Sequence, residues 1–221
     1  MSIYVYVEGD TEVLSLPSLL SGCYASRRLK KPIALGARFL MEIGRTAAEV
    51  LLRDARAHVF ACPDLAPNRS FLGHRWTYST YEELCELLRR EVLKQLGTRT
   101  NPDTAAKAVQ RLHPHPFRHD FEVVVLACPD RLRRYLGGDA DVTRWYTAKP
   151  EDQNFDEYPS RVLAKLFSKF RRTRYRKTQD APRILAGVTE QELSAICRMC
   201  PRFGDFVAAL RRVLEGMAGQ S

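Results

Sequence analysis

A short apolar run that ends at once in acidic residues constrains the fold of this 221-residue chain most. Residues 3–7 read Ile-Tyr-Val-Tyr-Val, and residues 8–12 read Glu-Gly-Asp-Thr-Glu. β-branched and aromatic residues at this density predict a buried strand, Gly9 predicts the turn after it, and the next residues predict a helix N-cap. Ligands of open α/β sheets bind at the carboxyl ends of the strands. Glu8 is therefore the first candidate functional residue.

The same pattern of strand and carboxylate recurs along the chain. Residues 57–62 predict a second buried strand, and Asp64 follows it directly after Pro63. A short strand is predicted at 33–36, and the most β-prone run lies at 122–127. Carboxylates at neighbouring strand ends suit Mg²⁺, which prefers oxygen ligands. The sequence thus predicts a site for Mg²⁺, or for Mn²⁺, that contains Glu8 and Asp64.

The residues that follow 128 predict helices rather than further strands. Thr189-Glu-Gln-Glu192 has the spacing of a capping box, as Thr80-Tyr-Glu-Glu83 has earlier in the chain. Cys197 and Cys200 form a CxxC pair within a helical pattern, and no second ligand pair lies near them, so we interpret them as buried thiols rather than a zinc site. We expect an α/β core at 1–128 and a helical extension at 129–221 packed on it.

Several blocks of the chain carry a family resemblance. Val7-Glu8-Gly9-Asp10-Thr11-Glu12 after an N-terminal strand resembles the first motif of the TOPRIM domain in the form used by OLD-type nucleases. The chain also resembles a family of small stand-alone TOPRIM-like proteins, and this resemblance implies an α/β, Rossmann-like, largely parallel sheet flanked by helices. The blocks that match in order are Arg118-His-Asp-Phe-Glu122, Pro150-Glu-Asp-Gln-Asn154, Tyr158-Pro-Ser-Arg161, Arg174-Tyr-Arg-Lys177 and Cys200-Pro-Arg-Phe203.

The resemblance also implies further site residues. Glu122 becomes the candidate for a third acidic ligand, and His119 for a ligand or a proton-transfer residue. The alternatives are that Glu122 pairs with an arginine and that His119 bonds only to backbone. Glu12 is expected to support the site from behind the ligands or to close an ion pair, and the block at 150–154 is expected near the acidic site.

One departure from the TOPRIM pattern bears on activity. TOPRIM domains hold Mg²⁺ with a glutamate after the first strand and an Asp-x-Asp after a later one, whereas here Cys62-Pro63-Asp64-Leu65-Ala66 carries a single aspartate. The literal Asp139-Ala-Asp141 follows a Gly-Gly turn, so we interpret it as a polar loop.

The charge of the chain favours an anionic partner. It has 35 Lys and Arg against 26 Asp and Glu, a net charge of +9, which favours nucleic acid because cationic side chains release counterions from phosphates. Between residues 161 and 183 nine basic residues stand against one acid, with aromatic residues interleaved. A solvated helix face with its aromatics in the core is the alternative. The candidates for nucleic-acid binding are Arg161, Lys165, Lys169, Arg174 and Lys177.

These observations lead to two functional hypotheses. The first is a Mg²⁺-dependent phosphodiesterase that cleaves nucleic acid. The second is an inactive, TOPRIM-derived binding or regulatory subunit, which the single aspartate favours. The resemblance implies an effector in prokaryotic anti-phage defence and an AAA or ABC-type ATPase as partner, and a homodimer is compatible with it. No apolar run is long enough for a membrane span and residues 1–20 lack a basic start, so a cytoplasmic protein is expected.

Overall fold

The computed structural model describes residues 2–65, 78–138, 140–145, 149–152 and 157–218. Within these residues four strands form one parallel sheet in the order β2-β1-β3-β4. β1 (Ile3–Val7) lies at its centre between β2 (Ile33–Ala34) and β3 (His58–Cys62), and β4 (Leu112–Pro114) pairs with β3. The predicted α/β class with a parallel sheet is confirmed.

The register of the sheet brings the acidic strand ends together. Val7 at the end of β1 pairs with Cys62 at the end of β3, and an isolated parallel bridge joins Asp64 to Phe117. Because neighbouring parallel strands end at the same edge, the residues that follow β1 and β3 meet there. The backbone amide of Asp64 donates to Oε2 of Glu8 at 3.2 Å, which ties the two turns to each other.

The strand predicted at 122–127 is wrong. Glu122–Leu126 form a short helix, α6, and all five of its residues are buried. α6 packs against α7 (Pro129–Leu136), α8 (Pro159–Leu166), α9 (Lys177–Leu185) and the 3₁₀ turn η4 (Pro150–Asp152). An apolar run of this length is compatible with either a buried strand or a buried helix, and here surrounding helices decide the outcome. β4 pairs with β3 instead, and no strand is predicted there from the sequence.

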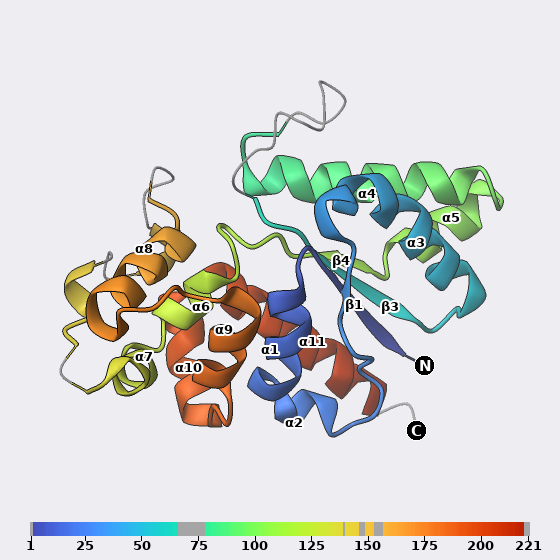
Figure 1. Ribbon diagram of the computed structural model, residues 1–221. Helices are drawn as coiled ribbons and strands as arrows, with labels where there is room; N and C mark the ends of the chain where they lie inside the picture. The colour runs from blue at the N-terminus through green and yellow to red at the C-terminus, as the bar shows by residue number, and fades with distance from the viewer. Residues whose placement is uncertain (1, 66–77, 139, 146–148, 153–156, 219–221) are drawn as a thin grey trace.

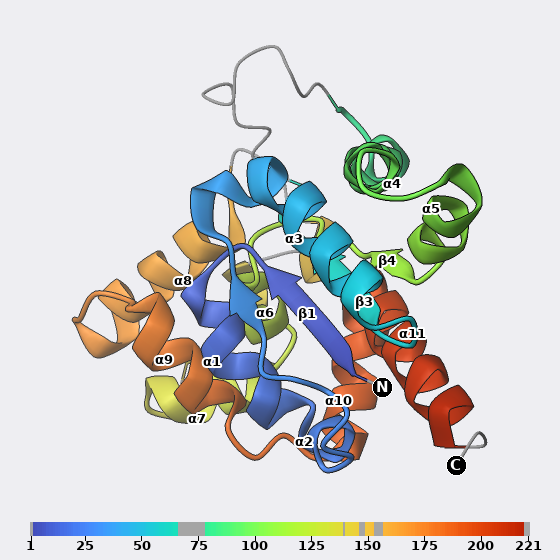
Figure 2. The same cartoon turned by 90° about the vertical axis from the view of Figure 1, so that its right-hand side faces the viewer.

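Side chains on alternate residues of each strand enter two separate cores. Val5 and Phe60 point into one core, and Tyr6 and Val59 into the other, as the two-residue period of a strand requires. The second core is covered by α3 (Phe39–Arg53), α4 (Tyr81–Gly97) and α5 (Pro102–Val109). Figure 2 shows these helices on one side of β1 and β3, and α1 (Asp10–Leu19) on the other.

The C-terminal helices form most of the first core. Phe206 on α11 (Pro201–Ala218) lies edge-on to Phe60 of β3, with their ring centroids 5.8 Å apart, and also contacts Phe117. α1 lies beside α9 in Figure 1, and α10 (Glu190–Met199) packs on α11. The remaining short elements are α2 (Ser21–Tyr24), η1 (Gly36–Arg38), η3 (Thr143–Trp145) and the π-helical turn η5 (Phe167–Arg171).

No helix in the described part of the chain is both long and apolar enough to cross a membrane.

Candidate functional site: an acidic pocket at the sheet edge

A pocket of about 310 Å³ lies at the carboxyl edge of the sheet. Three separate parts of the chain contribute its acidic lining: the turn from β1 into α1, the second residue after β3, and residues 120–122 that lead into α6. The N-terminus of α9 contributes the cationic side chain. The charged residues of the lining are Glu8, Asp10, Glu12, Asp64, Asp120, Glu122 and Lys177.

Gly9 allows the first turn of α1 to close over Glu12. A Cβ atom at position 9 would lie 3.1 Å from Oε2 of Glu12, closer than most such contacts. Glu12 is only 4% exposed, and burial raises its pKa to about 8, with Glu122 and Glu8 adding repulsion. The carboxyl group of Glu12 therefore gains or loses its proton near pH 8 rather than near pH 4.5.

Glu122 is held from two sides by the segment that leads into α9. The hydroxyl of Tyr175 donates to Oε1 at 3.4 Å, and Nζ of Lys177 donates to Oε2 at 3.2 Å. Nζ of Lys177 also lies 3.4 Å from Oδ2 of Asp120. Burial and Asp120 raise the pKa of Glu122 to about 7, although Lys177 opposes the shift. Burial alone would lower the pKa of Lys177, but Glu122 and Asp120 outweigh it and raise that pKa.

Asp64 is the carboxyl group of the pocket whose charged form is most disfavoured by burial and by its neighbours. Burial raises its pKa well above the usual range, and Glu12, Glu8, Asp120 and Glu122 repel its charged form further. Within the described residues, neither Oδ1 of Asp64 nor Oδ1 of Asp120 has a hydrogen-bond partner, although both atoms are buried. Among the residues that the structure describes, the pocket therefore concentrates more carboxylates than its one lysine neutralises.

A family model described as a domain of unknown function, DUF4276, matches residues 7–211. The chain belongs to the DUF4276 family. The match includes every residue that lines the acidic pocket. No curated protein and no solved structure matches the chain.

The structure brings together most of the acidic residues that the sequence analysis singled out in this DUF4276 protein. Glu8, Asp64, Glu122 and Glu12 all line the pocket. His119 does not: it is fully buried, and its Nε2 lies 3.2 Å from the backbone oxygen of Glu151. This contact with backbone is the alternative that the sequence left open for the histidine.

The block at 150–154 has a structural role where it is described. The carboxylate of Glu151 accepts from the backbone amides of Arg202 at 3.0 Å and Phe203 at 3.2 Å, which lie in the first turn of α11. Asp152 pairs with Arg118 at 3.1 Å on the surface. Neither acid lines the pocket, and residues 153 and 154 lie outside the described residues.

Of the five basic candidates, only Lys177 lines the pocket. Lys165 forms an ion pair with Glu157, and the guanidinium of Arg161 lies 5.2 Å from the ring of Tyr158. Lys169 lies over Trp145, and Arg174 is exposed between η5 and α9. These four surround α8 and the segment after it.

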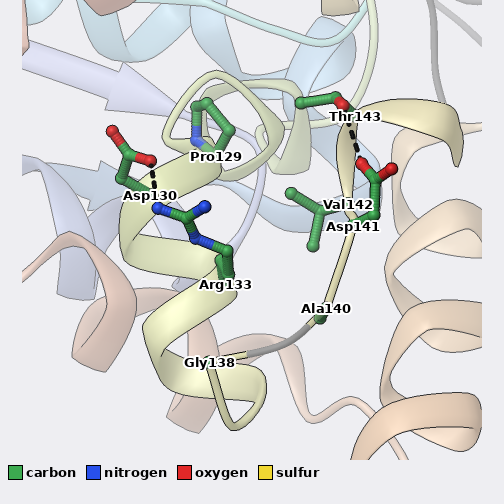
Figure 3. A pocket seen from close by; sticks show the side chains of 8 residues that line it. All are labelled: Pro129, Asp130, Arg133, Gly138, Ala140, Asp141, Val142 and Thr143. Carbon is green, nitrogen blue, oxygen red and sulfur yellow. Dashed lines mark hydrogen bonds and ion pairs between the residues drawn. The ribbon is translucent and has the colours of Figure 1, made fainter.

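The Asp-x-Asp of the sequence lies elsewhere. Asp139 is outside the described residues, and Asp141 accepts a hydrogen bond from Thr143 at 2.9 Å in a separate pocket of about 300 Å³, which Figure 3 shows. In the same pocket Asp130 pairs with Arg133. Neither cysteine of the CxxC pair lines the acidic pocket: Cys200 is fully buried, and its thiol lies 3.7 Å from the backbone oxygen of Val123 in α6.

Sequence reasoning did not assign a role to Asp120 or Tyr175. Asp120 stands within the block that carried the family resemblance, two residues before Glu122. The sequence does not show that its side chain faces the pocket. Tyr175 is separated from Glu122 by 53 positions and reaches it only through the packing of α9 on α6. Among the described residues, no three acidic, histidine or cysteine side chains are already arranged as a complete metal site.

Proposed function

We propose that this DUF4276 protein is a divalent-metal-dependent phosphodiesterase that acts on nucleic acid. The observation that carries the proposal is the convergence of Glu8, Glu12, Asp64, Asp120 and Glu122 on one pocket that contains a single lysine. Burying carboxylates without enough positive charge costs stability. Such an arrangement is typical of a site whose charge is balanced by a bound cation.

The donors of the pocket fit a hard divalent cation. Carboxylate oxygens are the ligands of Mg²⁺ and Mn²⁺, and the partnerless Oδ1 atoms of Asp64 and Asp120 are buried beside the pocket. Glu8, Asp64 and Glu122 are the residues that would hold the ion, with Glu12 behind them. A bound ion of this kind activates water and stabilises charge on a phosphodiester.

The chain itself supplies binding and proton transfer. Lys177 contacts Asp120 and Glu122 and lies half-exposed at the pocket, so its ammonium can turn from these carboxylates to a phosphate oxygen. The carboxyl of Glu12, with its pKa near 8, can accept or return a proton near neutral pH. The net charge of +9 attracts the polyanionic substrate.

A nuclease assay tests this proposal. Labelled DNA and RNA are incubated with Mg²⁺ or Mn²⁺ and with wild type, Glu8→Gln or Asp64→Asn. We expect metal-dependent cleavage by wild type and a loss of about 100-fold or more in both variants. Asp103→Asn on α5 removes an exposed carboxylate outside the pocket and serves as the matched control. Cleavage that needs no metal, or that persists in both variants, would contradict the proposal.

Two observations favour a second candidate, an inactive nucleic-acid-binding or regulatory subunit of an ATPase complex. A single aspartate follows β3, and the ammonium of Lys177 already bridges Asp120 and Glu122, as a metal ion would. This candidate predicts no cleavage, together with salt-sensitive binding that survives both substitutions. In either case the family resemblance supports the proposal of a cytoplasmic effector of anti-phage defence that works with an AAA or ABC-type ATPase.

A further inference from the structure

A basic extended segment leads from α8 to the acidic pocket. The π-helical turn η5 follows α8 and ends at Arg172, whose φ of 54° places it in the left-handed region. Residues 174–176 belong to no helix or strand, and Arg176, with φ of −117° and ψ of 101°, is extended where it leads into Lys177, the first residue of α9. In Figure 1 this orange segment crosses from the side of α8 to α9. Both π-helical turns and left-handed non-glycine residues are enriched at functional sites.

Alternate side chains of the segment face opposite ways. Tyr175 is 7% exposed and reaches Glu122 with its hydroxyl, whereas Arg174 and Arg176 on either side of it are exposed. Extended backbone advances about 3.3 Å per residue, so residues two positions apart stand about 6.6 Å apart. That spacing is similar to the distance between successive phosphates of one nucleic-acid strand.

Most of the positive charge of the segment is not neutralised by acids. Within the described residues, Arg172 and Arg174 have no ion pair with a carboxylate. Arg176 lies 3.5 Å from Asp180 but remains 56% exposed. The arginines can therefore contact an anion without first losing a strong internal partner.

An aromatic pair lies at the far end of the segment. The rings of Trp145 and Phe170 meet edge-to-face with centroids 6.3 Å apart, and both residues are half-buried. The ammonium of Lys169 lies 4.8 Å from the centroid of Trp145 and 5.4 Å from that of Phe170. A cationic path with aromatic rings along it is how proteins bind single strands, because phosphates follow the charges and bases stack on the rings.

We propose that residues 169–177, with Trp145, bind a single-stranded nucleic acid and lead its backbone into the acidic pocket. This strand track consists of Trp145, Lys169, Phe170, Arg172, Arg174, Arg176 and Lys177. The inference rests on the proposed action on nucleic acid and narrows it to unpaired strands. Tyr175 links the track to the site, because the same extended segment that presents the arginines also holds Glu122.

The burial of the carboxylates favours a single strand over a duplex. Glu122 is 1% exposed and Glu12 is 4% exposed, so a phosphate must enter the pocket to reach them. The phosphates of a duplex lie on a stiff double helix, whereas an unpaired strand bends freely into a recess. The arginines also follow one line along one segment, which matches one backbone rather than two.

Fluorescence anisotropy in EDTA tests the strand track directly. The probes are a labelled single strand of about 12 nucleotides and the blunt duplex of the same sequence. We expect wild type to bind the single strand at least about tenfold more tightly than the duplex. The triple variant Arg172→Gln/Arg174→Gln/Arg176→Gln should bind it roughly tenfold more weakly, and the slope of log K against log salt should fall by about 2.

Matched variants distinguish an effect of the strand track on binding from an effect of the overall charge of the protein. Arg53→Gln/Arg56→Gln/Arg90→Gln removes three exposed charges from α3, the turn after it and α4, and should change the slope far less. Trp145→Ala should weaken single-strand binding about fivefold or more, while Trp145→Phe should retain it. If the triple track variant does not fold, Arg172→Gln/Arg174→Gln removes only arginines without a described carboxylate partner.

Two results would overturn the inference: a duplex that binds as tightly as the single strand, or equal losses in the track and control variants. EDTA prevents metal-dependent cleavage, so this experiment does not depend on hydrolysis. Track-dependent binding by a protein that cleaves nothing would keep the inference and refute the phosphodiesterase. Metal-dependent cleavage with equal binding of both probes would keep the phosphodiesterase and refute the strand track.

Discussion

At the level of single residues, Glu12 shows that a buried carboxyl group of the pocket lowers the stability of the folded protein when it ionises. Its carboxyl group is buried beside other acids, and its pKa rises from 4.5 to about 8. The folded protein thus keeps a proton that the unfolded chain releases between these two values. The contribution of Glu12 to the free energy of unfolding therefore falls as the pH rises from 4.5 to about 8.

Glu12→Gln should stabilise the protein near pH 8 and leave it little changed near pH 5. Glutamine cannot ionise, so the variant avoids the charged form that burial disfavours, and we expect a gain of about 4 kcal/mol at the higher pH. Urea denaturation at both pH values measures the difference. Equal stability of wild type and variant at pH 8 would show that Glu12 is not strained in this way. Glu83→Gln is unsuitable as a control because Glu83 closes the capping box of α4, whereas Glu86→Gln on the exposed side of α4 is suitable.

The sequence predicted those site residues that follow a strand directly. Glu8 and Asp64 come after unmistakably apolar, β-branched runs, so their meeting at one sheet edge follows from strand order alone. Lys177, Tyr175 and Asp120 enter the site through packing between helices far apart in the chain. No local pattern encodes such packing, which is why Tyr175 was missed and His119 was expected in the site although it is buried against backbone.

At the level of secondary-structure elements, the sequence patterns that depend on contacts within one helical turn gave correct predictions. The capping boxes at Thr80 and Thr189 both form, and their helices begin where the sequence places them. The strand prediction at 122–127 was wrong because it relied on the strand propensity of Val123 to Val125. The helices packed around these residues impose a helical turn instead. Propensity is a weak guide for a segment that is buried on all sides.

Glu151 should stabilise α11 rather than take part in binding. Its carboxylate accepts from two amides of the first turn, where a negative charge also interacts favourably with the helix dipole. Glu151→Ala should therefore lower the free energy of unfolding by about 2–3 kcal/mol. Urea denaturation measures this loss. Asp152→Asn, which removes only an exposed ion pair, should cost less than about 1 kcal/mol. A loss for Glu151→Ala no larger than for Asp152→Asn would contradict the capping role.

At the level of the whole molecule, the sheet depends on the C-terminal helices. Ile3, Val5, Val7 and Phe60 pack in the same core as Phe203 and Phe206 of α11. The predicted helical extension thus covers one face of the sheet together with α1, and it also supplies Lys177 and Tyr175 to the acidic pocket.

Residues 1–128 alone should not fold cooperatively. Without the C-terminal helices, the apolar side chains of β1 and β3 on one face would lie in water, at a cost of about 25 cal/mol for each Å². Near-ultraviolet circular dichroism and urea denaturation of the fragment measure this. A sharp unfolding transition of residues 1–128 would show that the α/β core is an independent domain.

Calorimetric titration of Mn²⁺ shows directly whether the carboxylate pocket is a cation site. The titration is made near pH 8, at the pKa of Glu12 and above that of Glu122, because a metal ion binds deprotonated carboxylates. We predict saturable binding to wild type and to Asp103→Asn, and at least about tenfold weaker binding to Glu8→Gln and Asp64→Asn. No binding to wild type, or equal binding to all four proteins, would show that the carboxylate pocket is not a cation site.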